Sequence, residues 1–359
     1  MGSKKMKISD LDKNFKVEFS LEGENISWFD TKEEPFKVYG MCSYEKGDLF
    51  RRIPQAVAES VSDGVVKTGK CSAGGRIRFR TNSRRIAMKA ELPKWGNMWH
   101  MTFVGSSGFD LYAYNNDGEN RYMASLRPKE QKELYEALVT TDGEWRTYTI
   151  NMPLYKPVIE VSIGLDADAE IEEPQPYTYE KPVLFYGSSI TQGGCASRPG
   201  NAYVNMISNM LDCDVINLGF SGNAKGEKNM VDYLASLDAS VFVCDYDHNA
   251  PNPEWLRDTL APLYDTYRKE RPDTPFIFVS RPDFYEHIQE NVERREIVRE
   301  AYERALALGD KNVDFVDGSK LFDGPFSDSC TVDGGHPNDL GFFRMAIGIG
   351  AAVEKWLCK

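Results

Sequence analysis

Five short apolar segments in the second half of the chain constrain its fold more than any other feature. Each is too short to be a helix, and each is followed by a stretch in which apolar residues recur at helical spacing. Strands that are apolar on both faces are typical of a parallel sheet covered by helices on both sides. The segments are PVLFYG (182–187), DVINLG (214–219), SVFVCDYD (240–247), PFIFVS (275–280) and VDFVDG (313–318).

The first half of the chain has a different texture, in which apolar and polar residues alternate over short runs. In IAMKAEL (86–92) the apolar side chains fall on one face and the charged ones on the other, and YTINM (148–152) repeats the pattern. Turn-forming sequences separate such runs, which is typical of an antiparallel sandwich. Further strands are predicted at FKVEF (15–19), RIRFR (76–80), MWHMTFV (98–104), GFDLYAY (108–114) and IEVSIGL (159–165).

An acidic, proline-containing stretch at 166–182 separates the two textures and is interpreted as a linker. We therefore predict two domains, an all-β sandwich over residues 1–175 and a parallel α/β domain over residues 176–359. A chain of 359 residues is long enough to form two substantial cores.

Composition and charge narrow the classes of partner. Nucleic acids and anionic membrane surfaces are bound by basic patches, so a net charge of −12 argues against both. No stretch of 18 apolar residues predicts a membrane span, and the N-terminal lysines are followed by no apolar core of a signal peptide. We expect a cytoplasmic protein. Its seven scattered cysteines lack C-x-x-C spacing, which suits reduced thiols and gives no zinc-site signal.

Polar residues that could carry chemistry follow all five apolar segments. In a parallel sheet the carboxyl ends of the strands meet at one edge, and ligands bind beyond that edge. We therefore expect several functional groups to meet at that edge: a hydroxyl, an imidazole, a carboxylate and several hydrogen-bond donors. These are the groups that catalyse acyl transfer. In chain order these residues are Ser189, Gly222, His248, Asn249, Arg281, Asp333 and His336.

The order of four short motifs resembles that of the SGNH hydrolase family, also called GDSL-like lipases and acylhydrolases. The motifs are G-x-S-I-T (187–191), N-x-G-x-S-G (217–222), an asparagine after the third strand (Asn249) and D-x-x-H-P (333–337). The resemblance covers residues 180–359 and implies a three-layer α/β/α fold, here with a five-stranded parallel sheet.

The same resemblance implies a role for each motif residue. Ser189 would be the nucleophile, His336 the general base, and Asp333 the group that orients His336. The backbone N–H groups of Ser189 and Gly222, with the side-chain amide of Asn249, would form the oxyanion hole.

Two positions depart from the family pattern. Ser188 stands where the family has an aspartate before the nucleophile, and this leaves the chemistry intact because His336 supplies the base. The third motif usually reads G-x-N-D, whereas Asn249 follows the tripeptide YDH (246–248).

Several of these residues also allow structural interpretations. Serine after a strand is commonly a helix cap, which is the alternative for Ser189. Asp245, Asp247 and His248 could form a divalent metal site, but no paired histidine spacing supports it. We therefore expect His248 to line the site, expect no metal or other cofactor, and keep Arg281 as a second candidate for substrate binding. The charged run VERREIVRE (292–300) predicts a solvated helix face.

Trp95 and Trp99, in KWGNMWHMTF (94–103), are open to two interpretations. Aromatic residues of a sandwich are more often buried, which favours packing in the core. If exposed, either ring could form a platform for a sugar, so Trp99 is a candidate for substrate binding.

The blocks GRIRFRTNSRRIAMKAEL (75–92) and GFDLY (108–112) are similar to the jelly-roll module that precedes the catalytic domain in some carbohydrate esterases. That resemblance implies a serine esterase that removes acetyl or another small acyl group from a carbohydrate or glycoside. The alternatives are an acyltransferase that uses the same acyl-enzyme and a catalytically silent glycan-binding protein. The expected partner is a small-molecule or oligosaccharide acyl ester. Assembly into a homo-oligomer is an open alternative.

Overall fold

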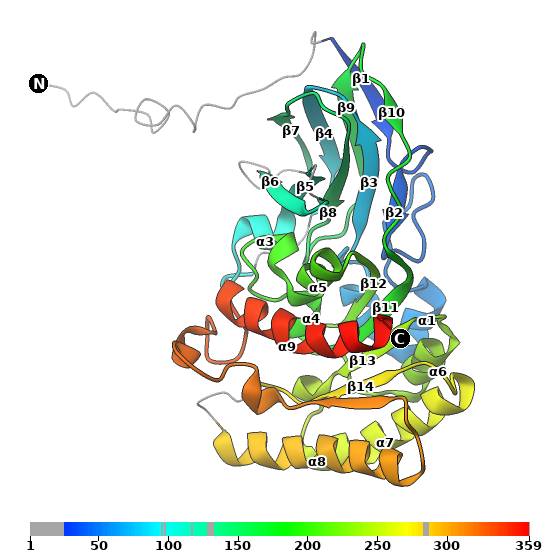
Figure 1. Cartoon of the computed structure of the whole chain (residues 1–359), viewed down its shortest axis with the longest axis vertical. Coiled ribbons are helices and arrows are strands. Elements are labelled where there is room, and N and C mark those ends of the chain that lie inside the picture. The colour runs from blue at the N-terminus through cyan, green and yellow to red at the C-terminus, as the bar shows by residue number, and fades with distance from the viewer. Residues whose placement is uncertain are drawn as a thin grey trace, which may run out of the picture.

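The computed structural model describes residues 25–94, 96, 98–115, 118–127, 133–282 and 287–358. A β-sandwich from the first half of the chain stacks on an α/β layer structure from the second half, as Figure 1 shows with the sandwich at the top. This arrangement confirms the predicted fold class. The predicted boundary between residues 175 and 176 stays a prediction.

The sandwich consists of two antiparallel sheets that enclose one apolar core. Strands β1, β9, β4 and β7 form one sheet in that order, and β10, β3, β8, β5 and β6 form the other, with β2 paired to β3. Alternate residues such as Ile77, Phe79, Ile86 and Met88 are buried between the sheets, as the alternation predicted. The strands are β1 (Ile26–Asp30), β2 (Lys37–Tyr39), β3 (Arg76–Thr81), β4 (Arg85–Glu91), β5 (Phe109–Tyr114), β6 (Asn120–Leu126), β7 (Leu134–Thr140), β8 (Arg146–Asn151), β9 (Glu160–Asp166) and β10 (Ile171–Glu172).

The second half forms a parallel sheet with the strand order β12-β11-β13-β14-β15. In β11, which lies between β12 and β13, Val183 and Phe185 pack into the core on one face of the sheet, and Leu184 and Tyr186 pack into the core on the other. Burial on both faces is the physical reason for the continuous apolar segments. The strands are β11 (Tyr179–Gly187), β12 (Cys213–Gly219), β13 (Val241–Asp245), β14 (Phe276–Val279) and β15 (Val313–Val316).

Helices cover both faces of this sheet and complete three layers. Apolar residues of α5 and α9 belong to one core, and those of α6, α7 and α8 to the other. The helices are α4 (Ser189–Gln192), α5 (Tyr203–Leu211), α6 (Lys228–Ser236), α7 (Pro253–Glu270), α8 (Ile288–Ala307) and α9 (Asp339–Leu357).

Several sequence expectations are corrected by the structure. The predicted strand at 98–104 is instead a turn followed by the short helix α3 (Phe103–Ser107), because Thr102 caps that helix by accepting a hydrogen bond from the Gly105 N–H at 2.9 Å. Two short helices, α1 (Gln55–Val61) and α2 (Asp63–Thr68), interrupt the strand-rich half. The expected linker is partly strand, since it contains β10 and the start of β11. The strand predicted at 15–19 lies outside the described residues.

A buried arginine fastens the two halves of the chain to each other. Arg52 is 1% exposed, and its guanidinium donates to the backbone carbonyls of Asn217 at 3.0 Å and Gly219 at 2.7 Å, at the end of β12. It also donates to the carbonyls of Thr68 and Cys71, which belong to the first half. One side chain therefore ties the sandwich to the edge of the parallel sheet where the site lies.

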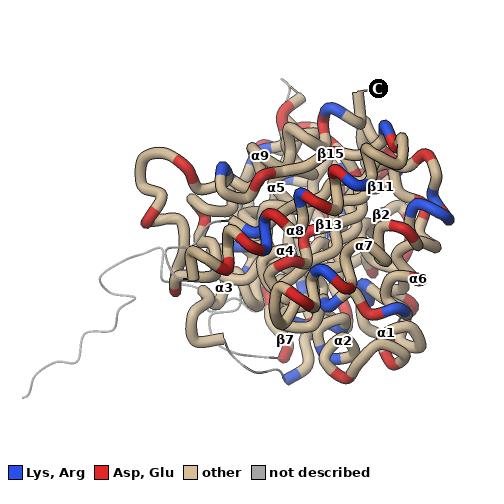
Figure 2. Tube along the Cα trace, turned by 90° about the horizontal axis from the view of Figure 1, so that it is seen from below, with Lys and Arg blue, Asp and Glu red and all other residues tan. Residues whose placement is uncertain are grey.

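Charged residues of both signs are interspersed along the chain in the helical part of the molecule (Figure 2). On α7 and α8, Arg304 pairs with Asp265 at 2.8 Å and Arg257 with Glu300 at 2.6 Å. Within the described parts of the chain, no helix is both long enough and apolar enough to cross a bilayer.

Candidate active site

The turn between β11 and α4 positions Ser189. Ser188 is the helix cap, because its hydroxyl accepts a hydrogen bond from the Ile190 N–H at 3.1 Å. Ser189 is then the first residue of α4, and its own hydroxyl is left for another partner. A side chain at Gly187 would lie 2.0 Å from the Thr191 hydroxyl and 2.5 Å from the Asp245 carbonyl, so only glycine fits where the strand turns into the helix.

Ser189, His336 and Asp333 form a continuous hydrogen-bonded chain. Ser189 Oγ lies 3.0 Å from His336 Nε2, and His336 Nδ1 lies 2.9 Å from Asp333 Oδ2. Ser189 is 5% exposed, whereas the side chains of His336 and Asp333 are about a quarter exposed, at 28% and 24%. Residues from opposite ends of the domain thus meet in the order that acyl transfer requires.

Local backbone contacts hold Asp333 ionised beneath the imidazole. Partial burial opposes ionisation, but hydrogen bonds from the His336 N–H, the His336 ring and the Gly335 N–H outweigh it and lower the pKa of Asp333 to about 2. The His336 N–H donates to Asp333 Oδ1 at 2.7 Å, so the same carboxylate holds both the backbone and the ring of His336. The carboxylate therefore fixes the tautomer in which Nε2 is free to accept a proton.

Two of the three predicted oxyanion donors, Gly222 and Asn249, follow the strands on either side of β11. Gly187 of β11 pairs with Gly219 of β12 and with Asp245 of β13, so the loops after these strands flank Ser189. Gly222 has φ +71°, a conformation that favours glycine, and open space lies where a side chain would stand. Asn249 ends the 3₁₀ turn Asp247–Asn249 and accepts from the Ala224 N–H at 3.5 Å, which joins the two loops.

His248 lies in the same turn after β13 as Asn249, and Arg281 follows the next strand, β14. Burial, followed by the nearby charge of Arg281, lowers the pKa of His248 to about 3, so its imidazole is neutral. Arg281 is 9% exposed, and its backbone N–H donates to Asp247 Oδ2 at 2.8 Å. Its guanidinium lies 3.6 Å from Glu290. These contacts place Arg281 under the turn that carries His248, and its role in substrate binding stays a prediction.

A buried arginine in the charged run 292–300 also supports this turn. Arg294 is 2% exposed and donates to the carbonyl oxygens of Asp247 at 2.8 Å and Ala250 at 3.0 Å. The prediction that the whole run is a solvated face is therefore wrong at Arg294. A charged residue at one position of a helix can turn inward where backbone carbonyls offer it partners.

Carboxylates that sequence reasoning considered for a metal site are occupied by protein donors. Asp245 accepts from the Tyr203 hydroxyl at 2.8 Å and from the Thr191 hydroxyl at 3.1 Å, and burial raises its pKa to about 7. Asp247 is held by the Arg281 N–H and by Arg294. In the described residues, the cluster of three potential metal ligands lies elsewhere, at His100, Cys195 and His336.

The sandwich half contributes residues to the site that sequence reasoning missed. The His100 ring lies 5.2 Å from the His336 ring, between centroids, and burial followed by the proximity of His336 lowers the pKa of His100. The Tyr155 hydroxyl donates to the backbone carbonyl of Ser189 at 3.2 Å. Histidine is rare in this chain, with four in all, and that scarcity was the one signal available for His100.

Trp99 corrects the expectation of core packing, because its side chain is 87% exposed. It lies on a turn and not on a strand, so neither face of a sheet buries it. Its ring lies 4.7 Å from that of His100, between centroids, which places it at the edge of the site. Trp95 lies outside the described residues.

An aspartate of the GFDLY block holds the loop that follows α4. Asp110 is fully buried and accepts hydrogen bonds from Asn151 at 2.8 Å, from the Arg198 guanidinium at 2.9 Å and from the Gly200 N–H at 2.8 Å. The sequence contained a signal for this role, because a charged residue inside the apolar run FDLYAY is buried only where it has hydrogen-bond partners.

Comparisons with known proteins agree with this geometry. Residues 180–352 match the GDSL-like Lipase/Acylhydrolase family, and residues 26–171 match the N-terminus of the SGNH-hydrolase type of esterase. A search of curated proteins gave no match.

Solved structures share the complete two-part architecture. A protein from Bacteroides ovatus described as a GDSL-like lipase is 31% identical with a TM-score of 0.84, over 93% of this chain and 98% of that one. A salicylyl-acyltransferase from a tetracycline biosynthetic pathway is 18% identical with a TM-score of 0.74, over 92% and 97%. A family two carbohydrate esterase from Cellvibrio japonicus is 11% identical with a TM-score of 0.61, over 93% and 98%. The last two show a common fold.

The motifs, the three-layer sheet domain and the similarity to the Bacteroides ovatus protein over nearly the whole of both chains lead to one conclusion. This chain belongs to the GDSL-like lipase/acylhydrolase family of SGNH esterases and carries the N-terminal domain typical of that esterase type.

Proposed function

We propose that this protein is a serine esterase that hydrolyses small acyl esters, acetyl esters above all, on a carbohydrate or glycoside. The observation that carries the proposal is the hydrogen-bonded chain from Ser189 through His336 to Asp333, with donor–acceptor distances of 3.0 and 2.9 Å. This intact chain argues against a catalytically silent glycan-binding protein.

The geometry supports catalysis through an acyl-enzyme. His336 Nε2 would accept the Ser189 proton as Oγ attacks the ester carbonyl carbon, and Asp333 would stabilise the resulting imidazolium. The tetrahedral intermediate then collapses, the bond to the alcohol oxygen breaks, and His336 returns the proton to that oxygen. Water attacks the acyl-enzyme with His336 again as the base, and the acid leaves as Ser189 regains its proton.

The negative charge that develops on the carbonyl oxygen needs donors on the side opposite His336. The N–H groups of Ser189 and Gly222 and the amide of Asn249 are the proposed donors. Asn249 accepts from Ala224 through its carbonyl oxygen, which leaves the amide nitrogen to donate to the substrate. Donors held by backbone and turn contacts need little reorganisation, and each contributes on the order of 3 kcal/mol.

Two features favour a small acyl group on a hydrophilic alcohol. The loops around the nucleophile, QGGCASRPGNAY (192–203), FSGNAKGE (220–227) and YDHNAPNP (246–253), are rich in glycine, proline and polar residues. They provide no continuous apolar wall for a long acyl chain, whose burial would contribute about 0.8 kcal/mol per methylene. The exposed Trp99 offers a flat apolar face beside the site, of the kind on which sugar rings stack.

An acyltransferase that uses the same acyl-enzyme is the second candidate. The neighbour named as a salicylyl-acyltransferase shares both halves of the fold and favours this candidate. The two reactions differ only in whether water or an alcohol receives the acyl group.

The test is hydrolysis of p-nitrophenyl acetate, butyrate and octanoate, beside a panel of acetylated sugars, with the Ser189→Ala variant as the blank. We expect kcat/KM to fall from acetate to octanoate and acetate to be released from at least one sugar. A preference that rises with chain length would contradict the carbohydrate assignment. Transfer of acetyl to an added alcohol in preference to water would favour the second candidate.

A further inference from the structure

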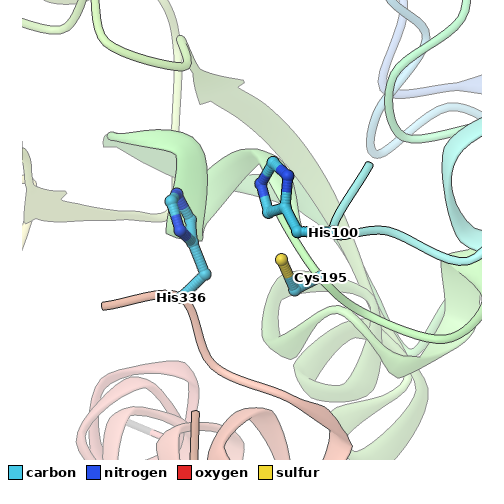
Figure 3. Close-up of side chains that lie close together, drawn as sticks. All are labelled: His100, Cys195 and His336. Atoms are coloured by element: carbon cyan, nitrogen blue, oxygen red, sulfur yellow. The ribbon is translucent and has the colours of Figure 1, made fainter. Parts of the chain in front are cut away.

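Three side chains that bind transition metals meet beside the nucleophile. The ligand atoms of His100, Cys195 and His336 all lie within 4.8 Å of one another. Figure 3 shows the two imidazoles side by side with the cysteine sulfur next to them. The three residues come from the sandwich half, the loop after α4 and the loop before α9, so only the folded chain brings them together.

We propose that His100, Cys195 and His336 form an inhibitory site for zinc or another divalent cation of similar softness. The proposal rests on the proposed function only in that His336 is the general base. Imidazole nitrogen and thiolate sulfur are the ligands that zinc prefers, whereas magnesium and calcium prefer oxygen.

The distances suit zinc after a small closure. Zinc–nitrogen and zinc–sulfur bonds of about 2.0 to 2.3 Å place tetrahedral ligand atoms about 3.3 to 3.6 Å apart. The observed separations of up to 4.8 Å therefore require an approach of about 1 Å. His100 lies on a turn and can supply this movement through its side chain.

Two of the ligands are held in place by contacts between their segments. The Thr102 hydroxyl, two residues after His100, donates to the backbone carbonyl of Ser197, two residues after Cys195, at 2.6 Å. Cys195 has φ +78°, a conformation that only a few per cent of non-glycine residues adopt, and its side chain is buried and not in a disulfide. The fold thus maintains an unfavourable backbone conformation at the residue that presents the sulfur.

A further feature of His100 points to a ligand. Within the described part of the chain, its buried Nδ1 has no hydrogen-bond partner. A buried imidazole nitrogen without a partner is costly, and a metal ion or its bound water would satisfy it.

The consequence for catalysis follows from the atoms involved. Asp333 holds Nδ1 of His336, so Nε2 is the nitrogen that a metal would take. A metal on Nε2 removes the lone pair that accepts the Ser189 proton, and the nucleophile is not activated. The Cys195 thiol loses its proton to solvent when the metal–sulfur bond forms, and no redox step is involved.

The first experiment measures metal binding without reference to activity. Cobalt replaces zinc as a spectroscopic probe on the metal-free full-length protein, and a thiolate-to-cobalt charge-transfer band reports a cobalt–sulfur bond. We expect the band in the wild type and in Ser189→Ala, and expect Cys195→Ser to abolish it. No band in the wild type would overturn the proposal.

The second experiment measures inhibition of p-nitrophenyl acetate hydrolysis by zinc after treatment with EDTA. We expect Cys195→Ser and His100→Gln to raise the half-inhibitory zinc concentration at least 10-fold. The matched controls are Cys358→Ser and His287→Gln, at an exposed cysteine and an exposed histidine outside the cluster, and they should behave as the wild type. His100→Gln on its turn provides a second test should Cys195→Ser fail to fold.

The outcomes separate this site from the proposed function. Equal inhibition of all variants, or activation by zinc, would overturn the inhibitory site. A cobalt–sulfur band that Cys195→Ser abolishes, in a protein that hydrolyses no ester, would support the metal site and contradict the proposed function.

Discussion

In the proposed mechanism Ser189 and His336 act as one unit, because a serine hydroxyl is a weak nucleophile until an imidazole accepts its proton. Their separation of 3.0 Å is within hydrogen-bond reach. We expect Ser189→Ala and His336→Ala each to lower kcat for p-nitrophenyl acetate by about 10³-fold or more, and the double variant to lose little beyond either single one. Steady-state kinetics test this, and wild-type turnover in either variant would show that the assignment is wrong.

We expect Asp333 to act through His336, so its substitution should lower activity less. Asp333→Asn keeps the base but weakens the contact at 2.9 Å that fixes its tautomer. We expect a loss in kcat that is about 10- to 100-fold smaller than that of His336→Ala. The same kinetic series measures it, and a loss as large as that of His336→Ala would mean that the carboxylate does more than orient the ring.

Asp245 should make stability depend on pH. Burial raises the pKa of Asp245 in the folded protein to about 7, above the ordinary value of about 3.9, so between these two pH values the folded state holds a proton that the unfolded state has released. The contribution of Asp245 to the free energy of unfolding therefore falls as the pH rises from about 4 to about 7, and the loss persists above that range. Asp245→Asn lacks this penalty.

We thus expect the melting temperature of Asp245→Asn, relative to the wild type, to increase from pH 4 to pH 7. The corresponding change in the free energy of unfolding is on the order of a few kcal/mol. Melting curves across this range measure it, with Asp48→Asn, at an exposed aspartate, as the control. A constant difference between variant and wild type would contradict a raised pKa at Asp245.

At the scale of elements, the loop between α4 and α5 is held from two sides. Asp110 of β5 binds Arg198 and Gly200 from the sandwich half, and Asp339 of α9 binds the Ser197 N–H at 2.9 Å and Asn201 at 2.9 Å. This loop carries Cys195 and follows Ser189, so contacts from the sandwich half hold a loop beside the candidate site.

We expect Asp110→Asn to destabilise the protein and to impair activity together. Both carboxylate oxygens accept hydrogen bonds, so an amide nitrogen at this position would leave at least one buried donor without an acceptor, which costs about 1 to 3 kcal/mol. Denaturant unfolding and KM for p-nitrophenyl acetate measure the two effects. Asp48→Asn also removes an aspartate paired with an arginine, at an exposed position, and should change neither. Unaltered stability in Asp110→Asn would show that the loop is held by other contacts.

At the scale of the whole molecule, the sandwich should influence the choice of substrate. Trp99 is 87% exposed, so its removal should leave the core intact. We expect Trp99→Ala to raise KM for an acetylated oligosaccharide several-fold and to leave KM for p-nitrophenyl acetate unchanged, because only the larger substrate reaches the ring.

The control for Trp99 is Leu308→Ala, at an exposed apolar residue just after α8, which should affect neither substrate. Melting temperatures verify that both variants are folded. Equal effects of Trp99→Ala on both substrates would mean that the ring supports the site as a whole. No effect on either substrate would mean that the sandwich serves assembly or solubility instead of substrate choice.

The sequence by itself determined the fold class, and it predicted which residues would meet at the candidate site. Because β11 is buried on both faces, its sequence is a continuous apolar run. Because β4 packs into the core of the sandwich on one face, its sequence alternates between apolar and polar residues. Ser189, Asp333 and His336 were found for a similar reason, because strand ends meet at one edge of a parallel sheet and Asp333 and His336 lie three residues apart.

Tertiary structure decided what depends on contacts between distant segments. His100, Tyr155 and Asp110 join the site because one half of the chain packs on the other, and no local periodicity encodes that packing. Arg294 turns inward because two carbonyls of a distant turn accept from it, and Trp99 is exposed because a cap at Thr102 replaces a strand with a helix. Periodicity reports which side of an element is buried, whereas the partners of a single polar side chain are set by the geometry of the whole fold.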